Sequence, residues 1–194
     1  MKKTMCLLLL LIFLFSFVSC RNVISNNLSS ETHLLSALKS EITFIAEDGK
    51  NIYLQDFAYA SDESTEYYAK PQEYAFIDFD GDNVDELVVD ITPNQVYYMV
   101  FHKNNDDVYG FLIGRRSLQS IKEDGSFIQT GGADINCYCK MEFDNDSYEI
   151  IDTAIKNETD GIYEINGKES TFGAVNEYIE AWNLKKDAEW IKVS

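Results

Sequence analysis

From Glu73 to Asn166, short apolar stretches alternate with turn residues, a pattern typical of β-strands joined by tight turns. The stretches are rich in Tyr, Phe, Ile and Val, and in chain order they are EYAFIDF, ELVVDI, QVYYMVFH, VYGFLIG, SLQSI, SFIQT, INCYCKMEF, SYEIIDTAI and GIYEIN. Such short connections favour antiparallel neighbours arranged as a meander. No stretch of helical length separates these strands, so parallel strand–helix–strand units are not expected.

Helical periodicity flanks the strands on both sides. A helix is predicted to begin near Ser30, with Leu34, Leu35 and Leu38 on one face. Near the C-terminus, apolar residues recur at helical spacing and form one stripe, Phe172, Val175, Tyr178, Ile179 and Trp182. We expect both helices to pack on the sheet, which gives an α+β fold with a mostly antiparallel β-sheet.

The chain between the first helix and the strands leaves two alternatives open. Residues 41–54, EITFIAEDGKNIYL, could extend the helix to Ala46 or form a hairpin around Asp48-Gly49. We favour the hairpin, because β-prone stretches flank a turn signal there. The charged stretch that follows, ASDESTEYYAKPQ, is expected to be a loop.

The N-terminal residues are predicted to be a secretory signal peptide. Lys2 and Lys3 precede an almost wholly apolar run from Met5 to Val18. This run is short for a membrane-spanning helix, which needs about 20 apolar residues. An ordinary signal peptide and a retained membrane helix are both alternatives to the lipoprotein leader described next.

The segment Phe17-Val18-Ser19-Cys20 resembles a bacterial lipobox. The resemblance implies that residues 1–19 are removed and that Cys20 becomes an acylated N-terminus. The chain is then secreted and held by its lipid on the outer face of the cytoplasmic membrane. Residues 20–30 form the lipidated cysteine and a polar tether, and residues 31–194 form a single globular domain.

The charge of the chain limits its partners. The formal net charge is −17, and removal of Lys2 and Lys3 with the leader makes it more negative. Such a surface repels nucleic acid and anionic lipid headgroups, and it suits cations, cationic ligands or neutral ligands. Membrane attachment would therefore depend on the acyl chains, without a polybasic patch.

Two further cysteines lie close together in NCYCK. Cys137 and Cys139 are two residues apart, so on a strand they point to the same face. We expect two free, half-buried thiols, because a bridge over this distance would strain the strand. A disulfide and a redox pair are the alternatives, while a zinc site lacks a second ligand pair.

The stretch FIDFDGDNVDEL places acidic residues between two apolar strands. Asp78, Asp80 and Asp82 occupy the first, third and fifth positions of this loop. Alternate oxygen ligands in a tight loop suit Ca²⁺, which takes about 6–8 oxygens. Gly81 and Asn83 tolerate the left-handed backbone that such a loop needs.

This loop departs from an EF-hand at its sixth and twelfth positions and in its strand-like flanks, and it resembles the β-type calcium loops of FG-GAP and VCBS repeats. The resemblance implies Asp78, Asp80, Asp82 and Glu86 as side-chain ligands, the Val84 carbonyl as a further ligand, and Asp85 as an outer member. Only one copy is present, so a β-propeller is not inferred. A solvated acidic turn without metal is the alternative to a structural Ca²⁺, and a functional metal is another.

The wider chain is similar to a group of small lipobox-bearing secreted proteins of Gram-positive anaerobes. The similarity rests on EYAFIDFDGDNVDELVVD, YYMVFH, VYGFLIGRRSL, DGSF, INCYCKMEF, YEINGKE and a final helix that ends in Trp. It covers residues 34–192 and implies secretion and one folding unit, without implying a reaction.

Signatures of catalysis are few. The chain has no Gly-x-Ser-x-Gly, His-Glu-x-x-His, Walker or dinucleotide-binding motif. His102 could act as a general base at the end of a strand, whereas His33 is expected to be solvated. Arg115 and Arg116, expected to face opposite ways on a strand, could bind an anionic group. Gly131-Gly132 is expected to be a plain turn, with an anion-binding nest as the alternative.

The sequence therefore predicts a cell-surface module that binds an extracellular ligand or protein. The alternative is an extracellular hydrolase that uses acidic residues and His102. A hydrolase needs two converging carboxylates, or a carboxylate and His102, in a cleft. A binding module instead exposes an aromatic or apolar patch.

Overall fold

The computed structural model describes residues 30–62, 65–92, 97–132, 134–144 and 146–194. The predicted signal peptide, the predicted lipidation site Cys20 and all of the predicted tether except Ser30 lie outside these ranges. Within them, no helix is both long enough and apolar enough to cross a membrane.

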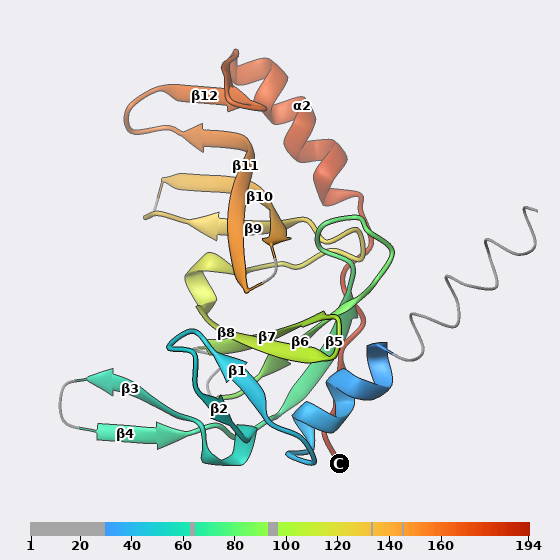
Figure 1. Cartoon of the computed structure of the whole chain (residues 1–194). Coiled ribbons are helices and arrows are strands. Elements are labelled where there is room, and N and C mark those ends of the chain that lie inside the picture. The colour runs from blue at the N-terminus through green and yellow to red at the C-terminus, as the bar shows by residue number, and fades with distance from the viewer. Residues whose placement is uncertain (1–29, 63–64, 93–96, 133, 145) are drawn as a thin grey trace, which may run out of the picture.

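A seven-stranded sheet forms the centre of the molecule, in the order β14-β5-β6-β7-β8-β1-β2 (Figure 1). Its strands are β1 (Phe44–Ala46), β2 (Asn51–Ile52), β5 (Glu73–Ile77), β6 (Glu86–Asp90), β7 (Tyr97–Asn104), β8 (Asp107–Gly114) and β14 (Ile191–Lys192). Strands β5 to β8 form the predicted antiparallel meander. Strand β1 pairs with β8 in parallel, so the sheet is mostly antiparallel.

A second, five-stranded meander lies beside the first sheet, in the order β13-β12-β11-β10-β9. Its strands are β9 (Phe127–Thr130), β10 (Ile135–Asp144), β11 (Ser147–Asn157), β12 (Ile162–Ile165) and β13 (Lys168–Glu169). The strand series therefore divides into two sheets. The divide follows β8, where the predicted strand SLQSI is wrong. A 3-10 helix, η2 (Arg115–Ser117), begins there, and only Gln119 forms a bridge, to Ile128.

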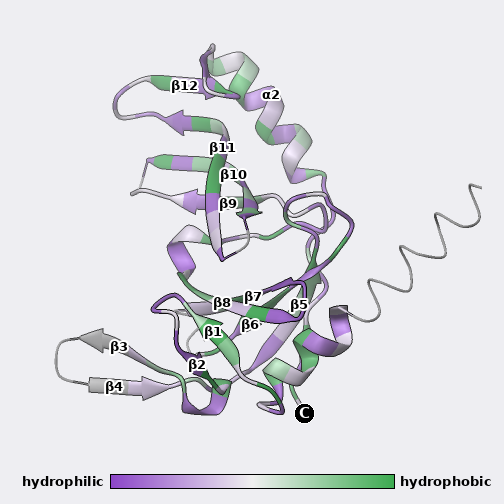
Figure 2. Cartoon of the chain, in the orientation of Figure 1, coloured by the Kyte–Doolittle hydropathy of each residue, from purple (hydrophilic) through white to green (hydrophobic). Residues whose placement is uncertain are grey.

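The two predicted helices flank the sheets, which confirms the α+β fold (Figure 1). The N-terminal helix covers residues 30–38, and Leu34 and Leu38 are buried. Helix α2 (Phe172–Asn183) begins at Thr171, whose hydroxyl accepts a hydrogen bond from the N–H of Ala174 at 3.2 Å. Polar and apolar residues alternate along both helices, as one-sided packing requires (Figure 2).

The stripe of α2 packs as predicted for most of its length. Val175 and Trp182 are buried, while Tyr178 and Ile179 are half-buried against Tyr138 and its neighbours on the second sheet. Phe172, at the first turn, is 51% exposed, and its ring contacts Tyr163 of β12 with centroids 5.5 Å apart.

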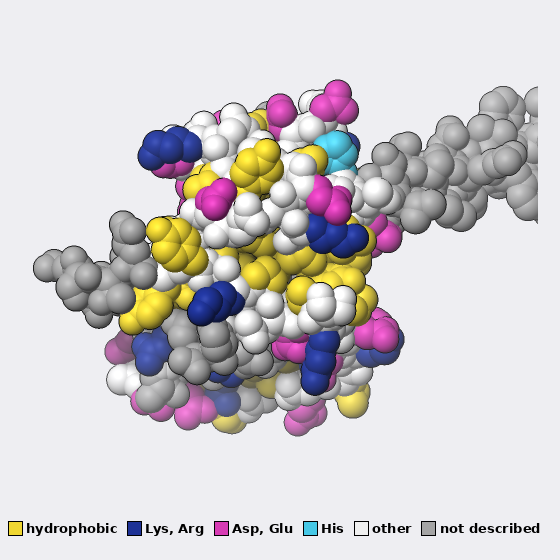
Figure 3. All heavy atoms as spheres, turned by 90° about the horizontal axis from the view of Figure 1, so that it is seen from below, with side chains coloured by type: hydrophobic (Ala, Val, Ile, Leu, Met, Phe, Trp, Pro, Cys, Tyr) yellow, Lys and Arg dark blue, Asp and Glu magenta, His cyan; other side chains and the backbone are white. Residues whose placement is uncertain are grey.

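Strand β6 is buried on both faces, so the first sheet separates two core clusters. Leu87 and Val89 belong to the cluster beneath the N-terminal helix, and Val88 belongs to the cluster shared with the second sheet. Successive strand residues point to opposite faces, which explains the division. On the side of the first cluster, apolar side chains gather in a band between charged ones (Figure 3).

The segment before β5 contains one confirmed hairpin and one that the sequence did not predict. Strands β1 and β2 pair around Gly49, whose φ is 79°. This confirms the predicted hairpin and excludes the alternative of a longer N-terminal helix. A short 3-10 helix, η1 (Leu54–Asp56), follows. The expected charged loop is instead the hairpin β3 (Ala58–Asp62) and β4 (Thr65–Tyr68). Stacking of Tyr59 on Tyr67, with ring centroids 6.0 Å apart, stabilises the hairpin despite its charges.

Cys137 and Cys139 are free thiols, as predicted, but only Cys137 is half-buried, because Cys139 is fully buried. Both contribute to the cluster between the two sheets, although a β-bulge follows Tyr138. The Cys139 thiol donates to a carboxylate oxygen of Asp152 at 3.3 Å. Burial raises the pKa of both thiols, so neither is activated as a nucleophile.

Candidate metal centre

The acidic loop spans residues 78–85 and joins β5 to β6. Ile77 and Glu86 are partners across this antiparallel pair, so the sheet itself brings the two ends of the loop together. Phe79 is fully buried beneath the loop and contacts Phe127 and Phe143 of the second sheet. Phe79 therefore anchors the loop in the core between the two sheets.

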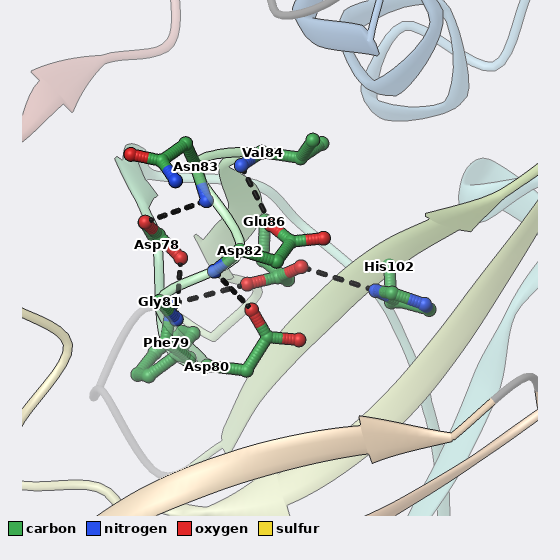
Figure 4. A network of polar contacts seen from close by, with 9 residues as sticks. All are labelled: Asp78, Phe79, Asp80, Gly81, Asp82, Asn83, Val84, Glu86 and His102. Carbon is green, nitrogen blue, oxygen red and sulfur yellow. Dashed lines mark hydrogen bonds and ion pairs between the residues drawn. The ribbon is translucent and has the colours of Figure 1, made fainter.

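Three carboxylates converge in this loop (Figure 4). Asp78, Asp80 and Asp82 each offer an oxygen, and these oxygens lie within 4.8 Å of one another. Calcium–oxygen distances are about 2.3–2.6 Å, so two ligands of one ion are at most about 5 Å apart. The spacing of the three oxygens therefore fits a single Ca²⁺ among them.

Asp78 organises the backbone of the loop. Its Oδ1 accepts from the N–H of Gly81 at 2.8 Å, and its Oδ2 accepts from the N–H of Asn83 at 3.1 Å. These bonds require the chain to coil sharply. Gly81 has a φ of 80° and Asn83 a φ of 67°, which confirms the left-handed conformations expected at both positions.

The two following carboxylates repeat this arrangement. Asp80 Oδ1 accepts from the N–H of Asp82 at 3.0 Å, and Asp82 Oδ1 accepts from the N–H of Val84 at 2.6 Å. An ionised carboxylate has about four lone-pair sites, so one accepted bond leaves capacity for a cation. The donor set contains only oxygen, which suits a hard cation such as Ca²⁺.

Electrostatic repulsion is present in the loop without a cation. The pKa of Asp80 is raised, first by burial and then by the negative charges of Asp82 and Asp78. The N–H of Asp82 and the ring of His102 oppose this rise without cancelling it. A bound cation would relieve the repulsion and favour the ionised carboxylates.

Glu86 lies at the first position of β6, where its side chain is 2% exposed. Its Oε2 accepts from the N–H of Phe79 at 3.2 Å, and its Oε1 lies 3.0 Å from Nδ1 of His102. Burial, the largest effect, raises the pKa of Glu86 to about 7. Glu86 is not part of the converging group of three, so its ligand role and that of the Val84 carbonyl stay predictions.

His102 connects the base of the loop to the second sheet. Its ring stacks on Phe143 of β10, with centroids 4.6 Å apart and an angle of 3° between the planes. Strand pairing explains its contact with Glu86, because Leu87 is opposite Phe101 on the neighbouring strand. Sequence reasoning missed this pair, although the alternation of side chains along β6 and β7 could have indicated it.

Gly125 makes another contact that sequence reasoning missed. It has a φ of 74°, and a Cβ atom there would lie 2.4 Å from the carbonyl oxygen of Asp78 and 2.6 Å from Cα of Phe79. The turn around Gly125 therefore packs closely against the backbone of Asp78 and Phe79 in the acidic loop. Only a glycine allows this approach without displacing the loop.

The other predicted ligand-binding residues lie elsewhere. Arg115 and Arg116 are exposed in η2, so the expectation that they face opposite ways on a strand is wrong, because β8 ends at Gly114. Two of the hollows on the described surface have volumes of about 290 Å³, beside β5, and about 80 Å³, beside β1. Neither hollow is lined by His102, Arg115 or Arg116.

Comparison of the chain with known proteins found no relative. No family model matches the chain, and no curated protein and no solved structure is significantly similar to it.

Proposed function

We propose that the chain is a lipoprotein anchored through Cys20 on the outer face of the cytoplasmic membrane, where it binds an extracellular ligand or protein partner and carries one structural Ca²⁺. The convergence of Asp78, Asp80 and Asp82 within 4.8 Å is the observation that supports the Ca²⁺. The leader sequence ending in Ser19-Cys20 supports the anchor.

The position of the loop favours a structural role for the ion. The loop ends are fixed by the pairing of Ile77 with Glu86, and Phe79 fills the core directly below. A cation held there would fasten the β5–β6 connection against the second sheet. When bound, Ca²⁺ would supply charge neutralisation and coordination only, with the protein providing the oxygen ligands.

A binding role is favoured over hydrolysis by the exposed aromatic residues. Tyr53, Tyr67 and Tyr68 are 40%, 45% and 55% exposed, and the last two lie on β4. Such rings provide contact area for a partner. His102, the expected base of a hydrolase, is instead bonded to Glu86 and covered by Phe143, which supports a structural role for it.

Two neighbouring acids could also suggest a hydrolase. Glu73 and Asp90 are partners across β5 and β6, but only Glu73 lines a hollow. Asp90 is 1% exposed and accepts from the N–H of Thr92 at 3.0 Å. Glu73 and Asp90 therefore do not both open into that hollow, so this pair of acids does not favour hydrolysis.

The calcium proposal is tested by melting the protein in EDTA, in several millimolar Ca²⁺ and in the same concentration of Mg²⁺. Extracellular sites commonly bind Ca²⁺ with dissociation constants of about 10⁻⁴–10⁻³ M, so millimolar Ca²⁺ should add on the order of 1 kcal/mol. We expect Ca²⁺ to raise Tm by a few degrees and Mg²⁺ to act weakly, because Mg²⁺ retains its waters.

Two matched variants distinguish Ca²⁺ binding at the acidic loop from a general effect of Ca²⁺ on a negatively charged protein. Asp80→Asn should abolish the Ca²⁺-dependent rise in Tm. Asp106→Asn removes an exposed acid from the turn between β7 and β8 and should leave the rise intact. Equal Tm values of the wild-type chain in EDTA and in Ca²⁺ would overturn the proposal.

A further inference from the structure

The larger hollow is a groove of about 290 Å³ where one end of the first sheet meets the C-terminal segment. Two aromatic residues, Tyr98 of β7 and Trp190, form part of its lining. Their ring centroids are 5.8 Å apart and their planes differ by 34°, and both residues are half-buried. The groove therefore offers two adjacent rings to anything that enters it.

Two carboxylates line the same groove. Glu73 is half-buried on β5, and the Asp187 side chain is 78% exposed beside Trp190. The residues known to line the groove include no lysine or arginine. Its lining thus combines aromatic rings with negative charge.

A buried acid adds to the negative potential behind the groove. Asp90 is the strand partner of both Glu73 and Tyr98, so these three residues form one row across β5, β6 and β7. The charge of Glu73 contributes to the raised pKa of Asp90, although burial is the larger cause. Two acids side by side, in a chain of formal net charge −17, make this end of the sheet negative.

Two positively charged side chains, those of Lys122 and Arg115, lie near the groove but do not line it. Nζ of Lys122 lies 2.5 Å from Oδ1 of Asp187 and 4.5 Å from the centroid of the Trp182 ring. Arg115 is exposed in η2, and its charge partly offsets that of Asp90. Glu73 lines the groove and forms no such ion pair in the described part of the chain, so no neighbouring cation neutralises its charge.

We propose that this groove binds a small organic cation, an alkylammonium group held against Tyr98 and Trp190 and attracted by Glu73, since the charge of Asp187 is already paired with Lys122. Aromatic faces and carboxylates both attract an ammonium group, and cation–π contacts contribute about 0.5–2 kcal/mol each. An anion would be repelled, and a neutral ligand would gain nothing from the charges. The inference gives a ligand class to the binding role proposed above and rests on it, but it is independent of Ca²⁺ at the loop.

Nuclear magnetic resonance of the two indole N–H groups tests the proposal on the full mature chain in a non-ionic detergent. The chain has two tryptophans, and the Trp182 N–H is buried and donates to Ser126 Oγ at 3.0 Å. Tetramethylammonium chloride is the probe, and tert-butanol is a neutral molecule of similar shape. We expect the cation to shift the Trp190 signal in a saturable way, to leave the Trp182 signal in place, and tert-butanol to shift neither.

Two variants, each with a matched control, locate the residues that supply the binding energy. Glu73→Gln should weaken binding about fivefold, and the fold should persist because the change relieves repulsion with Asp90. Glu142→Gln, an exposed acid on β10, is the matched control and should bind as the wild type does. Trp190→Leu should abolish binding, measured as saturation transfer from the protein to the probe. Tyr68→Leu removes an exposed ring elsewhere on the chain and should leave binding unchanged.

Each contrary result has a distinct meaning. No shift of Trp190 with the cation, or an equal shift with tert-butanol, would overturn the cation site. Binding of a neutral sugar in place of the cation would also overturn it but would keep the ligand-binding role. The Ca²⁺-dependent rise in Tm reports on the loop alone and is unaffected by either outcome.

Discussion

Glu86 and His102 form a pair across neighbouring strands, with Oε1 of the glutamate 3.0 Å from Nδ1 of the histidine. Both side chains lie on the face of the first sheet that packs against the second sheet, at the end nearest the acidic loop. The opposite end of this face carries Glu73, Asp90 and Tyr98. The polar residues therefore occupy two ends of a face whose middle is apolar.

The Glu86–His102 pair should make stability depend on pH. Because burial raises the pKa of Glu86 from 4.5 to about 7, the folded chain keeps a proton there that the unfolded chain releases. The free energy of unfolding should therefore fall as pH rises between about 4.5 and about 7, by on the order of 1–3 kcal/mol. Below about pH 4.5 both states are protonated and the contribution is fully present.

Glu86→Gln should remove this pH-dependent contribution, because the amide does not ionise. Urea unfolding in EDTA at about pH 5 and about pH 8 measures it. The variant should lose less stability than the wild type over this interval. An identical loss in both proteins would show that Glu86 titrates as an ordinary exposed carboxylate.

The close packing of Gly125 on the acidic loop predicts a large effect of adding one methyl group. Gly125→Ala should lower the free energy of unfolding by about 2–4 kcal/mol, because its Cβ would collide with Asp78 and Phe79. Gly49→Ala is the control, since Gly49 has a similar φ of 79° but nothing within 4 Å. It should cost only about 1 kcal/mol. Equal losses in the two variants would contradict the contact.

Thiol chemistry should find Cys137 and Cys139 reduced. Titration under denaturing, non-reducing conditions should detect both thiols, while in the native protein both should react slowly, because burial raises the pKa of each. Absence of free thiol in the denatured mature chain would mean that the two cysteines are bridged.

The lipid anchor is tested at Cys20. Mass spectrometry of the mature protein should find a diacylglyceryl group on this residue, and Cys20→Ala should release the chain into the medium. An unmodified N-terminus at another residue would contradict the lipobox interpretation.

Much of the fold follows from periodicity alone. Strands β5 to β8 and β10 to β12 were predictable because alternation and short turns specify antiparallel neighbours locally. The hairpin of β3 and β4 was not, because the stacking of Tyr59 on Tyr67 outweighs a charged, loop-like composition. The division into two sheets depends on the 3-10 helix that follows Gly114, for which the chain carries no strong turn signal.

In the candidate site, too, only the features that depend on local sequence could be predicted. The three aspartates and the left-handed Gly81 and Asn83 follow from spacing within one loop. The contact of Gly125 with Asp78 joins distant parts of the chain and depends on tertiary packing. The groove at Trp190 likewise needs the C-terminal segment to return beside β5, which no local pattern specifies.

The margins of the sheets have a consequence for self-association. Strands β2 and β14 border the first sheet and β13 borders one side of the second, and each has only two residues. A long exposed border strand would offer its free N–H and C=O groups to another copy of the chain. These short borders leave little length for such pairing, which disfavours the formation of intermolecular sheets along them.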